Sequence, residues 1–471
     1  MREYPGGRAW LVRWRAAAGA VIAVLIGGVL TAGCAASAGG RSASPGSPGG
    51  SSRSTGDDTV QPQLPTVVAN PSRASVLRTA EGMRGLGYQL ARVSAQPGKN
   101  VVLSPMSVAY ALAMLRAGAA GPTAAEIDRV AQFPADVAAV MNQLTRQIVT
   151  AGPVPTASTP AGTKDPGQPV APVAPVVRIA NRLYVQDGLP IGAAFTRTLT
   201  EQFGASPRSV DFTSPATNKA INDWVRTVTA GRITKLFDSL DPSTQLVLAN
   251  AIYLKASWQE PFMKGSTQPG AFTLAGGNTA RVPMMQRAGV MRYGAGAGWQ
   301  AVELPYSGGD LAMQVIVPTG STGAGSTGTG SGAGSTGAVN PVGLLAPTTL
   351  AAVRASLKQA VVDVSMPRWD FDTGFDLTKV LPDIGLTHAL EPGAFPGISP
   401  ELSISQAVHR ATITVDESGT EAAAVTGVAM QASAIGAPQH TVRADRPFAF
   451  VIVHRSTGVP LFVGTVNNPS A

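Results

Sequence analysis

The chain has 471 residues, a formal net charge of +8 and a single cysteine. One cysteine excludes an intramolecular disulfide. Four of the arginines lie within the first 15 residues and the other basic residues are spread along the sequence, so the charge does not form the stripe of a nucleic-acid-binding protein. Length and composition predict one folded domain at residues 73–471, preceded by segments too poor in large apolar residues to fold.

Residues 1–33 have the pattern of a signal peptide. Four arginines precede an apolar run at residues 16–30, which is too short and too rich in glycine for a membrane span. Cys34 follows directly after Ala32 and Gly33, and this arrangement resembles a bacterial lipobox; a chance cysteine in a cleavage region is the alternative. We therefore expect an exported chain that is lipidated at Cys34 and anchored to the extracytoplasmic face of the cell membrane.

Three further stretches have low complexity. Residues 34–72 are mostly Ser, Gly, Pro and Thr and predict a disordered tether. Residues 151–175 and 319–340 predict two insertions within the folded domain. The second insertion contains two GxGxxG strings, but no helical pattern follows them, so we interpret it as a linker and not as a dinucleotide site.

The first part of the domain has helical patterns. Apolar spacing predicts a helix at residues 75–93. A short strand follows, and Ser104 and Pro105 predict the N-cap and first turn of a buried helix that extends to about Ala117. Thr123 with Glu126 predicts the capping box of the next helix.

The middle of the domain alternates strands and helices. A continuous apolar segment at residues 246–262 is typical of a central strand covered on both faces. Asn250 within this segment is a polar residue that needs buried hydrogen-bond partners. Trp258 suits either a plain core position or a functional one. The other expected elements are strands at 176–185, 311–317 and 361–367, helices at 192–203, 216–229, 349–359 and 402–409, a helical turn at 376–381, and a terminal hairpin at 446–469.

The stretch from Thr412 to Thr426 combines two patterns. Residues 412–415 alternate polar and β-branched residues, which predicts a half-buried strand. After Gly419, small residues occupy every second position, and in an extended chain these share one face: Thr420, Ala422, Ala424 and Thr426. An alanine-rich run also suits a helix, but the preceding strand and the absence of a helical period up to Pro438 favour an extended loop.

No catalytic motif is present. The sequence contains no GxSxG, HExxH or CxxC string and no carboxylate cluster with metal-ligand spacing. We interpret His388, His440 and His454 as surface or edge residues, and place His409 on the expected helix at 402–409. The sequence therefore predicts a protein that is not an enzyme and that binds no metal or cofactor.

Three segments resemble the serpin family. They are the string NVVLSPMSVAYALAMLRAGAAGPTAAEI at residues 100–127, the Glu, Gly, Thr and alanine pattern at 417–424, and the PFAF and PLFVGTVNNP strings of the terminal hairpin. The resemblance covers about residues 73–470 apart from the two insertions. It implies an α+β fold with three β-sheets, about eight or nine helices and an exposed reactive-centre loop.

The resemblance also implies a function. A serine protease would cleave the loop, and the cleaved loop would insert into the central sheet as a new strand, which makes the protein a suicide-substrate inhibitor. The resemblance implies three groups of site residues: a hinge of Glu417, Gly419, Thr420, Ala422, Ala423 and Ala424; a shutter cluster of Ser104, Ser107, Asn250 and His409; and Trp258 at the breach, where the loop first enters. The alternative is a non-inhibitory binding or surface protein of the same fold, which would typically carry charged or bulky inward residues in the hinge.

The family's spacing locates the scissile bond. Counted from Glu417 the bond is Ser433–Ala434, whereas counting back from Arg446 gives Gly436, so we expect it within residues 430–436. Ser433 is the first choice, followed by Met430 and Ile435. No Lys or Arg lies between Glu417 and Arg443, which excludes a trypsin-like target and predicts an elastase-like or subtilisin-like protease with a small or apolar pocket.

Two negative expectations concern other partners. The insertion at 151–175 stands where glycosaminoglycan-binding serpins carry a basic helix, so no heparin-type site is expected. The protein is expected to act as a monomer.

Overall fold

The computed structural model describes residues 64–150, 174–319, 341–420 and 436–470. Every described residue belongs to one compact unit. Within these ranges no helix combines the length and apolar character needed to cross a bilayer.

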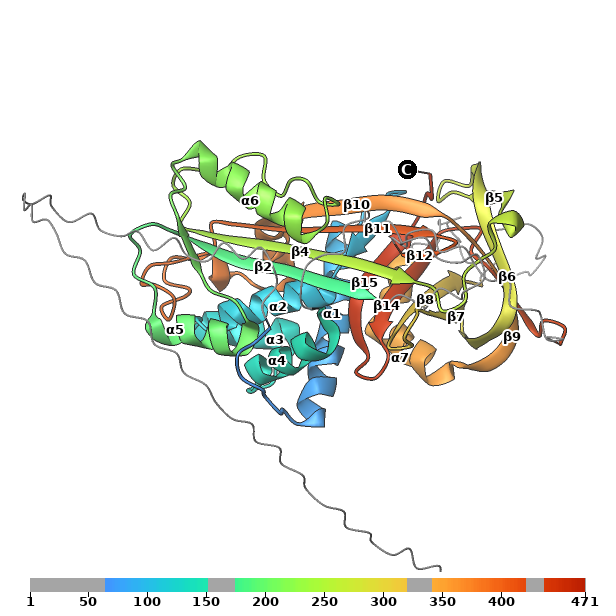
Figure 1. Cartoon of the computed structure of the whole chain (residues 1–471), viewed down its shortest axis with the longest axis horizontal. Coiled ribbons are helices and arrows are strands. Elements are labelled where there is room, and N and C mark those ends of the chain that lie inside the picture. Colours follow the sequence, from blue (N-terminus) through green and yellow to red (C-terminus); the bar gives the residue numbers. More distant parts are fainter. Residues whose placement is uncertain (1–63, 151–173, 320–340, 421–435, 471) are drawn as a thin grey trace, which may run out of the picture. The chain divides into compact units, whose positions relative to one another are not determined.

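Helices and two β-sheets make up the described part of the chain, which confirms the expected α+β class (Figure 1). The described residues contain eight α-helices, as expected: α1 (Arg73–Ser94), α2 (Pro105–Arg116), α3 (Gly121–Ala131), α4 (Val137–Ile148), α5 (Ala193–Thr198), α6 (Pro215–Val228), α7 (Pro347–Ser356) and α8 (Leu377–Val380). Five short segments are π- or 3-10-helical: η1 (Leu199–Phe203), η2 (Lys264–Ser266), η3 (Pro341–Leu345), η4 (Pro382–Ile384) and η5 (His388–Leu390).

A six-stranded sheet forms the centre of the molecule. Its strand order is β10 (Trp369–Asp376), β11 (Gln406–Asp416), β12 (Gly419–Thr420), β4 (Leu246–Ser257), β2 (Val176–Gln186) and β3 (Arg208–Val210). Alternate residues of β4 face opposite layers: Val247, Ala249 and Ala251 pack with α6, and Leu248, Ile252 and Leu254 face the main core. The helices α6 and α2 accordingly cover opposite faces of this sheet (Figure 1). Coverage on both faces explains why the sequence of β4 is continuously apolar.

The second sheet has nine strands. Its order is β1 (Val101–Leu103), β15 (Val459–Val466), β14 (Phe448–His454), β8 (Leu311–Pro318), β7 (Trp299–Pro305), β6 (Thr279–Gly296), β9 (Lys358–Pro367) and β13 (His440–Arg443), with β5 (Gln268–Thr273) paired to β6. Strand pairing in the described residues thus gives two sheets and not three. The reason is the 18-residue β6, which pairs with β7 at residues 292–296 and with β9 at residues 284–293, and so joins two groups of strands.

The helix predicted at residues 402–409 is wrong. Residues from Gln406 onward belong to β11, which pairs with β10 on one side and with β4 on the other. His409 therefore lies in a central strand and not on a helix. The apolar spacing of residues 402–409 is too short to distinguish a helix from a strand. Pairing on both sides supplies the backbone hydrogen bonds of β11 and decides for the strand. Lys358 and Gln359, expected at the end of a helix, are likewise the first residues of strand β9.

The capping box predicted at Thr123 and Glu126 does not form. Helix α3 begins earlier, at Gly121, and Thr123 lies inside it. The Glu126 carboxylate instead accepts hydrogen bonds from the backbone N–H groups of Thr387 and His388, each at 2.9 Å. The surface position predicted for His454 is also wrong, because this side chain is buried in β14 and bonds the Thr457 hydroxyl at 2.8 Å.

Residues 64–72, assigned above to the tether, lie against α4. The Asn142 side chain is buried; its Nδ2 donates to the Val67 carbonyl at 3.0 Å and its Oδ1 accepts from the Ala69 N–H at 3.3 Å. Arg146 Nη2 donates to the same Val67 carbonyl at 2.8 Å. Ordered packing therefore begins before Arg73.

Candidate functional site

The two central strands of the six-stranded sheet, β11 and β4, separate at one end. They pair in parallel from Gln406 opposite Val247 to Ala411 opposite Ile252. Beyond that point β12 lies between them, and Thr420 pairs with Val415 of β11 and Ala256 of β4. The two strands are therefore separated at this end by a two-residue strand, and the described part of this segment ends at Thr420, between them.

Gly419 lies close to the backbone of β4. Its φ is +148°, and a Cβ atom at this position would lie 2.1 Å from the carbonyl oxygen of Ala256. Only glycine fits this close approach. The next residue, Thr420, is buried, and its hydroxyl shares a 2.6 Å hydrogen bond with the hydroxyl of Tyr306, whose pKa is raised by burial.

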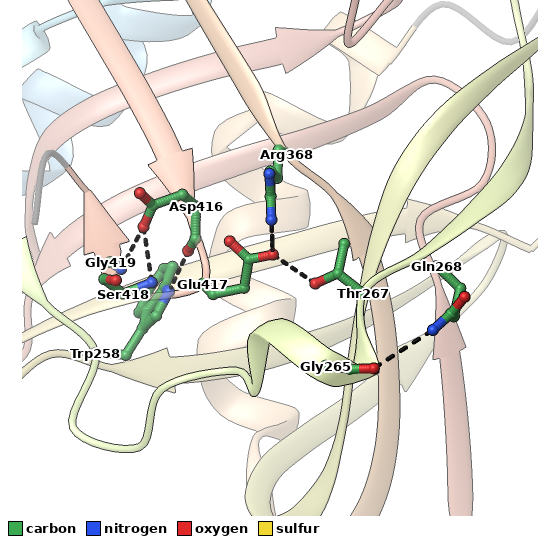
Figure 2. A network of polar contacts seen from close by, with 9 residues as sticks. All are labelled: Trp258, Gly265, Thr267, Gln268, Arg368, Asp416, Glu417, Ser418 and Gly419. Carbon is green, nitrogen blue, oxygen red and sulfur yellow. Dashed lines mark hydrogen bonds and ion pairs between the residues drawn. The ribbon is translucent and has the colours of Figure 1, made fainter. Parts of the chain in front are cut away.

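Trp258 lies beneath the turn that leads into β12. Its indole N–H donates to the Asp416 carbonyl at 2.9 Å, and its backbone N–H donates to the Ser418 carbonyl at 2.9 Å. The indole stacks on the Tyr306 ring with centroids 4.6 Å apart. Figure 2 shows the Asp416 carboxylate, in turn, accepting from the N–H groups of Ser418 and Gly419. Trp258 is therefore a buried core residue, and it also contacts the turn that leads into β12.

Glu417 is a buried carboxylate in the same turn, with 3% of its side chain exposed. It accepts a hydrogen bond from Arg368 Nε at 2.8 Å, a second from Arg368 Nη2 and a third from the Thr267 hydroxyl (Figure 2). Burial favours a raised pKa for the Glu417 carboxyl, but the hydrogen bonds from Arg368 and Thr267 outweigh it and hold the pKa below its usual value. The charged Glu417 carboxylate therefore links the turn to Arg368, which follows β9, and to Thr267, which precedes β5.

A buried polar cluster lies further along the same two strands, where β11 and β4 pair directly. His409 and Asn250 are opposite each other in that pairing, and His409 Nδ1 bonds Asn250 Oδ1. The Ser104 N–H donates to His409 Nε2 at 3.1 Å, and Asn250 Nδ2 donates to the Ser107 carbonyl at 2.7 Å. Burial lowers the pKa of His409 to about 3, so the ring is neutral at pH 7 and its Nδ1 carries the proton.

One member of this cluster was missed by the sequence analysis. Asn181 of β2 pairs with Asn250 across the sheet, and its Oδ1 accepts from Asn250 Nδ2 at 2.6 Å and from the Ser107 hydroxyl at 3.3 Å. The available signal was an asparagine within the alternating strand at 176–185. Tyr306, Arg368 and Thr267 were also missed, and no local sequence pattern indicates that they bond Thr420 and Glu417.

Comparison with known proteins identifies the family. A family model described as serpin (serine protease inhibitor) matches residues 83–469. The chain belongs to the serpin family.

Relatives of this serpin occur in archaea and animals. It is 32% identical over 390 residues to an uncharacterized serpin-like protein of Thermococcus kodakarensis, a match that covers 81% of this chain and 84% of that one. It is 31% identical over 391 residues to the leukocyte elastase inhibitor of Equus caballus, covering 79% and 94% of the two chains. The native crystal structure of tengpin, a thermophilic serpin, matches with a TM-score of 0.70 at 23% identity over 86% of this chain and 97% of that one, which shows the fold.

The structure describes some of the site residues expected for this serpin and not others. The four shutter residues lie within one hydrogen-bonded cluster, and Glu417, Gly419, Thr420 and Trp258 surround the opening of the sheet. The remaining expected site residues lie outside the described residues: Cys34, Ala422, Ala423, Ala424, Met430, Ser433, Ala434 and Ile435. Among the residues that are described, no group of three or more His, Cys, Asp or Glu side chains is arranged to hold a metal ion.

Proposed function

We propose that this serpin inhibits serine proteases by cleavage of the segment between β12 and β13 and insertion of its N-terminal part into the six-stranded sheet. The position of β12 carries the proposal, because its two residues already occupy the place of a new strand between β11 and β4. The protease serine would form an ester with the carbonyl carbon at the cleaved bond, and the amine of the following residue would leave.

The register of β12 predicts the path of insertion. If the pairing of Thr420 with Val415 and Ala256 continues, Ala424 reaches Ala411 and Ile252, where β11 and β4 now pair with each other. Thr426 then reaches His409 and Asn250 of the polar cluster. Insertion must therefore separate these two side chains, which makes their hydrogen bond a barrier to opening the sheet.

Side-chain size supports the same path. Ala422 and Ala424 have the same parity as the buried Thr420 and would face the same layer, opposite the buried Ile413 and Leu254. A closely packed interior accepts small side chains at such positions with little strain. Insertion of about a dozen residues at roughly 1 kcal/mol per net hydrogen bond gives on the order of 10 kcal/mol, which is enough to distort a bound acyl-enzyme.

The composition of the loop supports the target class. No Lys or Arg lies between Glu417 and Arg443, so a protease whose pocket binds a cation has no residue to bind there. One relative, 31% identical, is named leukocyte elastase inhibitor. We propose an elastase-like or subtilisin-like target and cleavage within residues 430–436, with Ser433–Ala434 as the preferred bond.

The test is a covalent complex with such a protease that survives boiling in detergent. In the wild type, mass spectrometry should place the new N-terminus between Gln431 and Ala437. Thr420→Arg should fold with β12 displaced from the sheet, and it should be cleaved without trapping the protease, because insertion would bury the unpaired charge at a cost of several kcal/mol. Thr279→Arg, at an exposed position of β6, is the matched control and should inhibit normally.

Three results would contradict the proposal in different ways. Unchanged inhibition by Thr420→Arg would refute insertion, and efficient trapping of trypsin would refute the target class. Cleavage of the wild type without any complex would refute inhibition and favour a non-inhibitory serpin-fold binding protein.

We also propose that the chain is exported and lipidated at Cys34, on the apolar run and the single cysteine described above. A fatty-acid analogue supplied during growth should label the wild type and not Cys34→Ala. Soluble, unlabelled protein in both cases would refute the anchor.

A further inference from the structure

An open groove of about 460 Å³ lies where the chain returns from the reactive-centre loop into β13. Its walls come from β6, β9, β13 and the end of α7, through Tyr293, Lys358, Ala360, Ser356, Gln439 and His440. The wall nearest the loop is firmly held. The Gln439 N–H donates to the Val361 carbonyl at 2.8 Å, and the His440 ring stacks on Tyr293 with centroids 3.9 Å apart.

The groove has a positive charge that nothing in its walls neutralises. No carboxylate is among the lining residues. Lys358 lies at the first position of β9 opposite Tyr293, is exposed, and makes no ion pair with any other residue that the structure describes. A polar groove with one free ammonium group is complementary to a segment that carries a carboxylate.

The distance along the chain determines what can reach this groove. Five peptide links join the Cα atoms of Ala434 and Gln439, and they span at most about 17 Å when fully extended. A protease domain of roughly 230 residues has a radius of gyration of about 17 Å, so an enzyme bound at Ser433–Ala434 extends at least as far as the groove.

We propose that this groove is a second recognition site for the target protease. It binds an acidic segment of the enzyme's surface, on the side of the enzyme that faces the residues C-terminal to the scissile bond. The inference rests on the proposed function, because it places the protease on the loop. The groove is fixed on β9 and β13, whereas the acylated end of the loop leaves with the protease on insertion. The contact therefore strengthens the encounter complex and not the final covalent one.

The test uses elastase-like and subtilisin-like proteases in which the catalytic serine is replaced by alanine, so that binding is measured without cleavage. For at least one of these enzymes, Lys358→Ala should weaken binding about threefold and Lys358→Glu about tenfold, because a unit charge pair about 6 Å apart in water changes a binding constant by roughly threefold. The loss should shrink in high salt, which screens exposed charges. Lys99→Glu, at an exposed lysine in the turn before β1, is the matched control and should bind like the wild type.

Each outcome separates this proposal from the proposed inhibition. Equal affinity of wild type and Lys358→Glu for both inactive proteases, or no measurable binding of either one to the wild type, refutes the groove as a recognition site. If active protease forms no covalent complex and Lys358→Glu still weakens binding of the inactive enzyme, inhibition is refuted and the groove is supported. If a covalent complex forms, Lys358→Glu should slow its formation while its lifetime stays unchanged.

Discussion

Replacing Gly419 by alanine tests whether β12 contributes to the native sheet. The added Cβ would lie 2.1 Å from the Ala256 carbonyl oxygen, about 1 Å inside an ordinary contact distance. The strand β4 cannot move away, because it is buried and paired with β2 along almost its whole length. We therefore expect β12 to leave the sheet.

The cost of that change is limited by what β12 contributes. Leaving the sheet breaks the pairing of Gly419 and Thr420 with β11 and β4, and it breaks the hydrogen bond between Thr420 and Tyr306. About three hydrogen bonds at roughly 1 kcal/mol each give a destabilisation of about 3 kcal/mol. With a urea dependence of about 3 kcal/mol per molar, the first unfolding midpoint should fall by about 1 M.

Urea unfolding followed by tryptophan fluorescence is the appropriate assay, since Trp258 contacts the turn that would move. Gly265→Ala is the matched control, because a Cβ at that position meets open space, and its midpoint should not change. A Gly419→Ala midpoint equal to that of the wild type would show that β12 contributes nothing to the native sheet, and the proposed start of insertion would be wrong.

Three further predictions concern buried polar groups. The pKa of His409 is lowered to about 3 by burial, whereas the unfolded value is about 6.5, so the unfolded chain binds a proton that the native chain does not. The free energy of unfolding should therefore decrease by about 2 kcal/mol from pH 6.5 to pH 5, and His409→Gln should remove this slope; an equal slope in the variant would contradict the argument. A double-mutant cycle of Glu417→Gln with Arg368→Gln should give a coupling free energy of about 1 to 2 kcal/mol, a range that already allows for the 43% exposure of the Arg368 side chain. A coupling below about 0.5 kcal/mol would show that this ion pair does not stabilise the turn. A chain that begins at residue 73 should be less stable in urea by about 2 to 3 kcal/mol than one that begins at residue 64, because it loses the Ala69 N–H that bonds the buried Asn142 Oδ1 and the Val67 carbonyl that accepts from Asn142 and Arg146; equal stability would mean that residues 64–72 contribute nothing.

Much of the fold could be predicted because its elements have strong local patterns. The continuous apolar run of β4 and the Ser104 N-cap of α2 are recognisable from adjacent residues alone, and both are present. The alternation of small residues after Thr420 stays a prediction, because residues 421–426 lie outside the described residues.

The partners of the site residues could not be predicted in the same way. Asn181 joins Asn250 only because β2 and β4 pair in one particular register, and no local pattern determines that register. The ion pair of Glu417 with Arg368 joins residues 49 positions apart in sequence. The helix wrongly predicted at residues 402–409 has the same cause, because its true partners are two other strands.

Composition alone misplaced the start of the folded unit. Residues 64–72 have the polar, proline-containing composition of the preceding segment, yet they are held through backbone carbonyl and N–H groups that any sequence supplies. The information lies in Asn142 and Arg146 of α4, far along the chain.

The place of the last two strands has a consequence for how a cleaved molecule behaves. Although β14 and β15 follow the loop in sequence, they lie in the interior of the nine-stranded sheet, between β8 and β1. Every residue of β15 is buried, and so is every residue of β14 except the half-buried Val453. After a cut in the loop, the C-terminal peptide should remain bound, so the nicked protein keeps its native mass and elutes as one particle. Denaturation then releases the peptide, and its mass identifies the bond that was cut.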